Sequence, residues 1–144
     1  MTGHSGLNSD LQLACRGDLW AIRNALKDVE DFLTGHGVAR SEIEDVTLVL
    51  AEAMTNIARH AYSEAKGDIR LTLRLNKRRM QCEIADTGCA FDPSGLGQTA
   101  PEPTVFSEGG YGWFIIRSLS EGLSYTRKNG RNNLSFSLPV AAMT

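Results

Sequence analysis

The chain has 144 residues, of which 42% are hydrophobic and 22% charged, and its formal net charge is −2. That length suits one domain built round one core. The slightly acidic balance argues against a nucleic-acid-binding surface, which usually carries a basic excess. The basic run at 77–79 is too short to change this, because three charges at a hairpin tip are more often a solvated turn. No apolar stretch approaches the roughly 20 residues of a membrane span, so neither a membrane nor a nucleic acid is expected as a partner.

The cysteines and the N-terminus indicate the compartment. Cys15, Cys82 and Cys89 are odd in number and form no CxxC pair, so we expect neither a disulfide framework nor a zinc site. Residues 1–10 are polar, without the apolar stretch of a signal peptide, and are predicted to be a flexible tail. Together these features predict a cytoplasmic protein.

The first part of the chain reads as a strand followed by two helices. Residues 11–16 alternate apolar and polar, as a half-buried strand does. A first helix is expected from an N-cap at Asp18 to the glycines at 35 and 37. Its predicted core stripe consists of Leu19, Ile22, Leu26, Val29 and Leu33. A second helix is expected to start at the capping box Ser41-x-x-Glu44 and to run to Ala61. Its predicted core stripe consists of Ile43, Val46, Leu50, Ala53, Ile57 and Ala61.

The second part of the chain adds two hairpins and one helix. Residues 69–76 and 80–86 alternate strictly, and their short connection makes them an antiparallel hairpin. Residues 91–110 lose all periodicity and hold prolines and glycines, which predicts a functional lid. A short helix from Gly112 is expected to end at Gly122, before strands at 123–127 and 133–138. The predicted domain spans 11–139, a two-layer α/β (α+β) sandwich whose mixed, mostly antiparallel sheet has helices on one face.

Four polar side chains follow one another along the second helix. Glu52 and Asn56 are four residues apart, with Arg59 and His60 one turn further on. A carboxamide can complete a magnesium shell beside a triphosphate, and a carboxylate one turn earlier can act as a general base on a hydroxyl attacking the γ-phosphate. Arg59 and His60 could balance phosphate charge. The alternatives are an ordinary polar helix face, and cations that oppose the helix dipole.

Two glycine-containing motifs lie further along. Asp86-x-Gly88 follows a strand, so its carboxylate could accept from the amine of adenine while the glycine lets the base come close. Ordinary turns use the same residues. Gly110-x-Gly112 opens a helix, where backbone N–H groups bind anions, although glycine is common at such junctions. Neither the Rossmann fingerprint nor the P-loop is present, and no nucleophile–histidine–acid triad can be assigned.

In this order and spacing the motifs resemble the Bergerat (GHKL) ATP-binding superfamily, which includes DNA gyrase and the histidine kinases. The segments "EAMTNIARHAY", "FDP" and "GWFIIRSLSEGLSY" are most similar to the RsbW-like anti-sigma-factor serine/threonine kinases, and the resemblance covers about residues 10 to 138. The resemblance implies that Glu52 is the general base and Asn56 the magnesium ligand. It implies that Asp86 and Gly88 hold adenine and that Gly110 and Gly112 line the phosphate end of the lid. Arg59 and His60 match family positions beside the phosphates.

The resemblance also implies a function. Such a protein uses ATP and Mg²⁺, binds a sigma factor and phosphorylates a serine or threonine of an anti-sigma-factor antagonist of the STAS type. Members of the family also dimerise through the first strand and helix, so the resemblance implies a possible homodimer. Only seventeen residues precede the first helix, too few for the phosphoacceptor hairpin of a complete histidine kinase, so a stand-alone module is expected.

Three departures from the family pattern leave an alternative open. Ala90 replaces a turn glycine, Tyr111 stands where an arginine is usual, and Arg131-Asn132 replaces the usual Gly-Thr. Asn132 could still hydrogen-bond near adenine. The first two departures favour the alternative of a non-catalytic module whose partner affinity depends on ATP.

Overall fold

The computed structural model describes residues 9–61, 67–90 and 110–141. In chain order the elements are β1 (Asp10–Arg16), α1 (Leu19–Gly35), α2 (Arg40–Ala61), β2 (Asp68–Leu75), β3 (Arg79–Asp86), α3 (Gly110–Leu119), β4 (Glu121–Lys128) and β5 (Arg131–Pro139). The strands form one sheet in the order β1-β2-β3-β5-β4, and every neighbouring pair is antiparallel. Of the predicted lid, residues 91–110, all but Gly110 lie outside the described residues.

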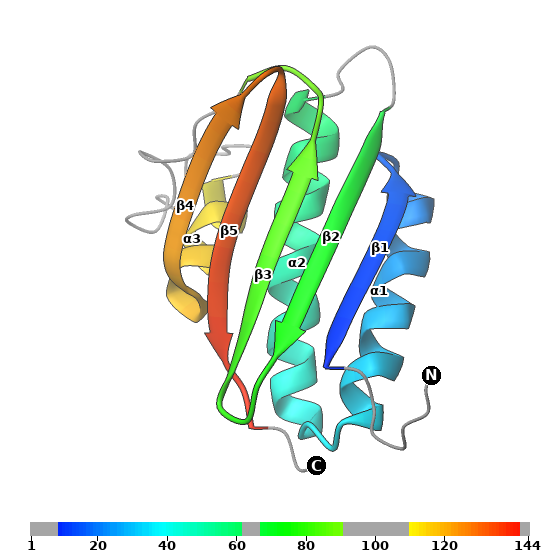
Figure 1. Ribbon diagram of the computed structural model, residues 1–144, viewed down its shortest axis with the longest axis vertical. Helices are drawn as coiled ribbons and strands as arrows, with labels where there is room; N and C mark the ends of the chain where they lie inside the picture. Colours follow the sequence, from blue (N-terminus) through cyan, green and yellow to red (C-terminus); the bar gives the residue numbers. More distant parts are fainter. Residues whose placement is uncertain (1–8, 62–66, 91–109, 142–144) are drawn as a thin grey trace.

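The helices α1, α2 and α3 cover one face of the sheet, and no described helix lies on the other face (Figure 1). This is the predicted two-layer sandwich. The period-two pattern of β2 buries Ile69, Leu71 and Leu73 against the helices and exposes the residues between them. On α2 the predicted stripe is confirmed where it is described, and its most buried members are Val46, Leu50, Ala53 and Ile57.

Helix α1 begins and ends as the sequence predicts, but its stripe differs. The Asp18 side chain accepts a hydrogen bond from the Ala21 backbone N–H at 2.8 Å, which confirms the N-cap. Gly37 has φ 76°, the left-handed conformation that ends many helices. The prediction that Leu19 faces the core is wrong: it is 67% exposed and lines a groove between α1 and α2.

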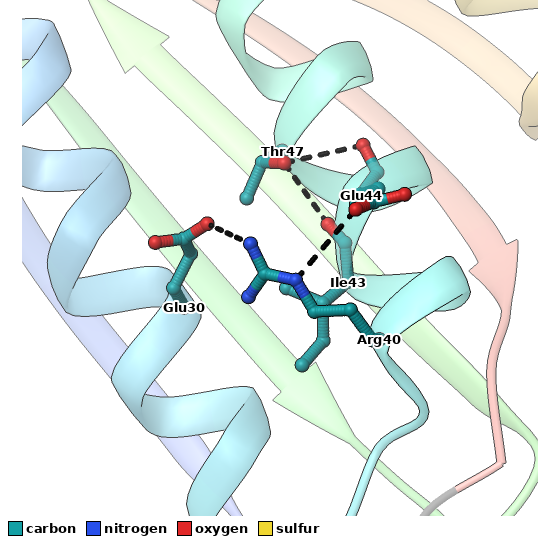
Figure 2. Close-up of polar contacts among 5 residues, drawn as sticks. All are labelled: Glu30, Arg40, Ile43, Glu44 and Thr47. Atoms are coloured by element: carbon teal, nitrogen blue, oxygen red, sulfur yellow. Dashed lines mark hydrogen bonds and ion pairs between the residues drawn. The ribbon is translucent and has the colours of Figure 1, made fainter.

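The predicted capping box of α2 is not formed. The helix begins at Arg40, and the carbonyl of Ala39 accepts from the N–H groups of Glu42 and Ile43, so Ser41 lies inside the first turn. Arg40 instead links two helices: its guanidinium lies 3.3 Å from Glu30 on α1 and 3.7 Å from Glu44 (Figure 2). Exposed ion pairs of this kind contribute only about 0–1 kcal/mol, so apolar packing holds α1 to α2.

Gly122 was predicted to end the last helix and instead lies in β4. Helix α3 ends at Leu119, and Gly122 has φ 67° at a bulge between Glu121 and Ser124. Glycine serves both purposes for the same reason, since it alone adopts positive φ without strain. Strands β4 and β5 are joined by a two-residue turn, Asn129-Gly130, with φ 53° and 75°. Two positive φ values are typical of a type I′ hairpin turn.

Candidate nucleotide site

The site begins where α2 meets the first turns of α3. A Cβ built on Gly112 would lie 2.6 Å from Glu52 Oε1 and 3.1 Å from Asn56 Nδ2. Only a glycine therefore allows this turn of α3 to approach the two polar side chains so closely. The structure thus brings Gly112 next to Glu52 and Asn56, which come about 60 residues earlier in the sequence. Backbone N–H groups at a helix N-terminus favour anions, so this corner suits phosphate oxygens.

Asn56 is a buried polar side chain with an unused group. Its residue is 2% exposed, and its Nδ2 has no hydrogen-bond partner among the described residues. An unpaired buried amide costs roughly 1–3 kcal/mol, and such groups often mark functional positions. A carboxamide held here can turn an oxygen toward a bound cation.

Asp86 forms the second part of the site. It is the last residue of β3 and is only 3% exposed. One carboxylate oxygen, Oδ1, accepts from the Gly88 N–H and from Asn132 Nδ2, each at 2.9 Å. The other oxygen, Oδ2, is buried and has no partner within the described part of the chain. The carboxylate is therefore held at one oxygen and can accept a hydrogen bond at the other.

A small network from β4 and β5 holds the turn after Asp86. Asn132 Nδ2 also donates to the carbonyls of Cys89 at 3.0 Å and Gly88 at 3.3 Å. Its Oδ1 accepts from Arg127 at 2.8 Å and from the Tyr125 hydroxyl. Arg127 also donates to the Gly88 carbonyl at 3.0 Å. The Asn132 amide therefore fixes the turn itself, with both of its ends occupied by protein groups.

Sequence reasoning did not find Arg127 or Tyr125. The signal that could have revealed Arg127 is the Asn129-Gly130 turn, because a two-residue turn sets the register of its hairpin. That register places Arg127 directly opposite Asn132. Asn132 was expected near adenine; in the structure it contacts the turn that follows Asp86.

The remaining predicted site residues are only partly described. Arg59 lies on α2 and is exposed. His60 belongs to α2, and Gly110 is the first residue of α3. The surroundings of these two residues and of Tyr111 are outside the described part of the structure. In Figure 1 the end of β3 and the C-terminal end of α2 lie at the same end of the molecule.

The thiols of Cys15 on β1 and Cys82 on β3 are half-buried and buried, respectively. Burial raises the pKa of the Cys82 thiol well above its ordinary value of 9.0. The pKa of Cys15 is raised by burial and then by Asp18 and Asp68. Both thiols therefore stay protonated and unreactive at neutral pH. Among the described residues no group of three or more metal-binding side chains gathers, and no helix has the length and apolarity to cross a bilayer.

The chain matches a known protein family. Residues 15–138 match the histidine kinase-like ATPase domain, and the chain belongs to that family. It is similar to the serine-protein kinase RsbW of Bacillus thuringiensis (strain Al Hakam) and of Bacillus anthracis, each with 30% identity over 100 residues. These matches cover 65% of this chain and 62% of each relative, so the chain matches less than two thirds of the relatives' length.

A solved structure supports the fold. The crystal structure of the RsbU and RsbW domains of Rv1364c from Mycobacterium tuberculosis superposes with a TM-score of 0.67. The match covers 95% of this chain and 34% of that chain, at 15% identity. At that identity the likeness shows a shared fold.

Proposed function

We propose that this protein is an ATP- and Mg²⁺-dependent serine/threonine kinase that binds a sigma factor and phosphorylates an anti-sigma-factor antagonist of the STAS type. One observation carries the proposal: the Glu52 carboxylate lies against Gly112 in the N-terminal turn of α3. This puts a proton acceptor next to the backbone groups that favour phosphate. The kinase relatives named RsbW support the same reaction.

The adenine end of the nucleotide is recognised by Asp86. Its free Oδ2 accepts from the exocyclic amine of the base, a group that guanine lacks at this position. Because Asn132 and Gly88 already hold Oδ1, the carboxylate is oriented before the nucleotide arrives. Gly88 leaves room for the flat base beside the turn.

At the phosphate end, Asn56 and Glu52 have different tasks. Asn56 would hold a magnesium ion through its side-chain oxygen, and the ion would neutralise charge on the nucleotide's phosphates. The phosphates would supply further oxygens, because among the described residues no three acidic, histidine or cysteine side chains gather into a cation site. Glu52 accepts the proton of the substrate hydroxyl as its oxygen bonds to the γ-phosphorus and the bond to ADP breaks.

The groove between α1 and α2 suits the sigma factor. This hollow of about 700 Å³ is lined by Leu19, Leu26 and Leu48, and Trp20 lies nearby on α1 with 70% exposure. Arg23 and Lys27 line the same groove and form no ion pair with another described residue. An amphipathic helix with acidic side chains complements both features, so we assign the groove to such a helix of the sigma factor.

The deciding experiment combines titration and phosphotransfer. Calorimetry with Mg-ATP and Mg-ADP measures binding, and radiolabelled ATP with the antagonist measures transfer. The Glu52→Gln variant keeps the side chain's shape, so we expect ATP affinity within about twofold of wild type and transfer reduced by at least ~100-fold. Equal phosphorylation by this variant contradicts the assigned role of Glu52. Tight ATP binding by the wild type without any transfer favours the non-catalytic binding module instead.

A further inference from the structure

The open face of the sheet carries a hollow that the proposed function does not use. Figure 1 looks onto this face, and no described helix covers it. The hollow has a volume of about 410 Å³ and is lined by polar and charged side chains of β2, β3, β4 and β5. A smaller hollow of about 190 Å³ adjoins it and shares three of its residues, Arg70, Ala85 and Arg131.

Ala85 forms the floor between two arginines. It is the cross-strand partner of Arg70 on β2 and of Asn133 on β5, and Arg131 is two residues before Asn133. Adjacent strands lie about 4.8 Å apart, and an arginine side chain is longer than that spacing. Because the methyl group of Ala85 fills little space, both guanidinium groups can reach over it from opposite sides.

The cations round this floor form no ion pair within the described part of the chain. They are Arg70, Lys128 and Arg131. Lys128 and Arg131 are direct cross-strand partners, and like charges placed directly opposite one another destabilise a sheet. An anion bound between them would reduce that repulsion.

The surrounding carboxylates limit the size of the anion. Glu83 lines the hollow two residues before Ala85 on β3, and Asp68 lines the adjoining hollow two residues before Arg70 on β2. Their negative charges repel an extended polyanion such as a nucleic acid or an acidic tract. A compact dianion avoids them. A guanidinium group can donate two parallel hydrogen bonds to a phosphate, and the hydroxyl of Thr126, which also lines the hollow, is a further donor.

We propose that the open face of the sheet binds a phosphate monoester, with Arg70 and Arg131 gripping its oxygens over the Ala85 methyl group. The site adjoins the proposed nucleotide site, because Asp86 also lines the smaller hollow. The two use opposite faces of the sheet: Asn132 and Asp86 are on the face toward the helices, whereas Arg131 and Ala85 are on the other face. Binding of the monoester is therefore tested with the nucleotide site filled.

The test is a titration of the ¹⁵N-labelled protein followed by NMR, in the presence of saturating Mg-ADP so that the nucleotide site is filled. The probes are inorganic phosphate and O-phospho-L-serine, at constant ionic strength set with sodium chloride. We expect saturable shifts of the Ala85, Arg131 and Asn133 amides. Arg70→Gln and Arg131→Gln should each weaken binding about tenfold or more, since each removes charge-assisted hydrogen bonds.

Arg74→Gln is the matched control. Arg74 lies on the same strand and the same face as Arg70, but outside both hollows, so its loss should change affinity by less than about twofold. Tighter binding of phosphoserine than of phosphate identifies an organic monoester as the ligand, and equal binding identifies the free phosphate group. Shifts spread over all surface cations, or equal losses in the Arg70 and Arg74 variants, overturn the proposal. So do saturable shifts confined to the Gly112 turn.

Discussion

Gly112 lies so close to Glu52 that a Cβ at position 112 would come within 2.6 Å of the Glu52 carboxylate oxygen. The carboxylate is the far end of a flexible side chain, so it can rotate away, whereas the helix backbone cannot. The contact therefore links the absence of a side chain on α3 to the position of the proposed base on α2. Position 112 controls where Glu52 points.

Gly112→Ala should consequently separate activity from stability. Alanine favours a helix over glycine by about 1 kcal/mol, so we expect an unchanged or higher melting temperature by circular dichroism. The displaced Glu52 should reduce phosphotransfer by at least ~10-fold. Gly35→Ala is the control, because no atom lies within 4 Å of the added Cβ. Full transfer activity in the Gly112 variant would show that the position of Glu52 is not set by this contact.

Asn132→Ala should weaken both the fold and the binding of ATP. It removes the donor to Asp86 Oδ1 and to the carbonyls of Gly88 and Cys89. Unsatisfied buried groups cost about 1–3 kcal/mol, which chemical denaturation can measure. We expect calorimetry to show at least ~10-fold weaker ATP binding.

Arg127→Ala provides the comparison for that variant. Arg127 contacts the same turn through Gly88 and Asn132, but it is exposed. Its loss should therefore cost less than about 1 kcal/mol of stability and weaken ATP binding by only a fewfold. An Arg127 variant that binds ATP as poorly as the Asn132 variant would contradict the central role given to Asn132.

The three thiols should react at very different rates. Cys89 is exposed, Cys15 is half-buried, and Cys82 is fully buried. We expect one rapid reaction with Ellman's reagent in the native protein, and full reactivity only in denaturant. Cys89→Ser should abolish the rapid phase. Two rapid thiols in the native protein would contradict the burial of Cys82.

Burial of Cys82 also predicts a loss of stability at alkaline pH. Its folded-state pKa is raised above the ordinary 9.0, so the folded state keeps a proton that the unfolded state releases. The stabilisation is complete below pH 9 and falls as pH rises above it. Denaturant titrations at pH 8 and pH 10 measure the difference. Cys82→Ala should show a smaller pH dependence than the wild type.

Trp20→Ala should impair partner binding without affecting the fold. An exposed substitution usually changes stability by less than about 0.5 kcal/mol, whereas an exposed tryptophan beside a groove is a typical binding hot spot. We expect at least ~10-fold weaker binding of the sigma factor by calorimetry. Arg78→Ala, at the β2–β3 hairpin, is the control. An unchanged affinity in the Trp20 variant would contradict a role for Trp20 in docking, and the same result for Leu48→Ala, which changes a residue that lines the groove, would exclude the groove itself.

Local patterns predicted most of the fold. The alternation of β2 and β3 and the Asp18 cap depend on residues close in sequence, and the structure confirms them. The errors arose where one residue type serves two purposes. Gly122 suits a bulge as well as a helix end, and Ser41 suits a first turn as well as an N-cap.

The site was predicted less completely, because its geometry depends on distant contacts. Spacing along one helix suggested Glu52 and Asn56, and family resemblance added Asp86 and the glycines. The packing of Gly112 against α2 cannot be read from local sequence, since it depends on how two helices cross. Arg127 was missed because its role requires the register between β4 and β5.

The central position of β5, between β3 and β4, has a consequence for how the protein matures. Asp86 is synthesised early, but Asn132, which orients it, joins the sheet only when the last strand inserts beside β3. Such pairing between distant segments forms slowly. We therefore expect the proposed adenine contact to form only in molecules whose β5 has paired with β3, so nucleotide occupancy would report on completion of the sheet.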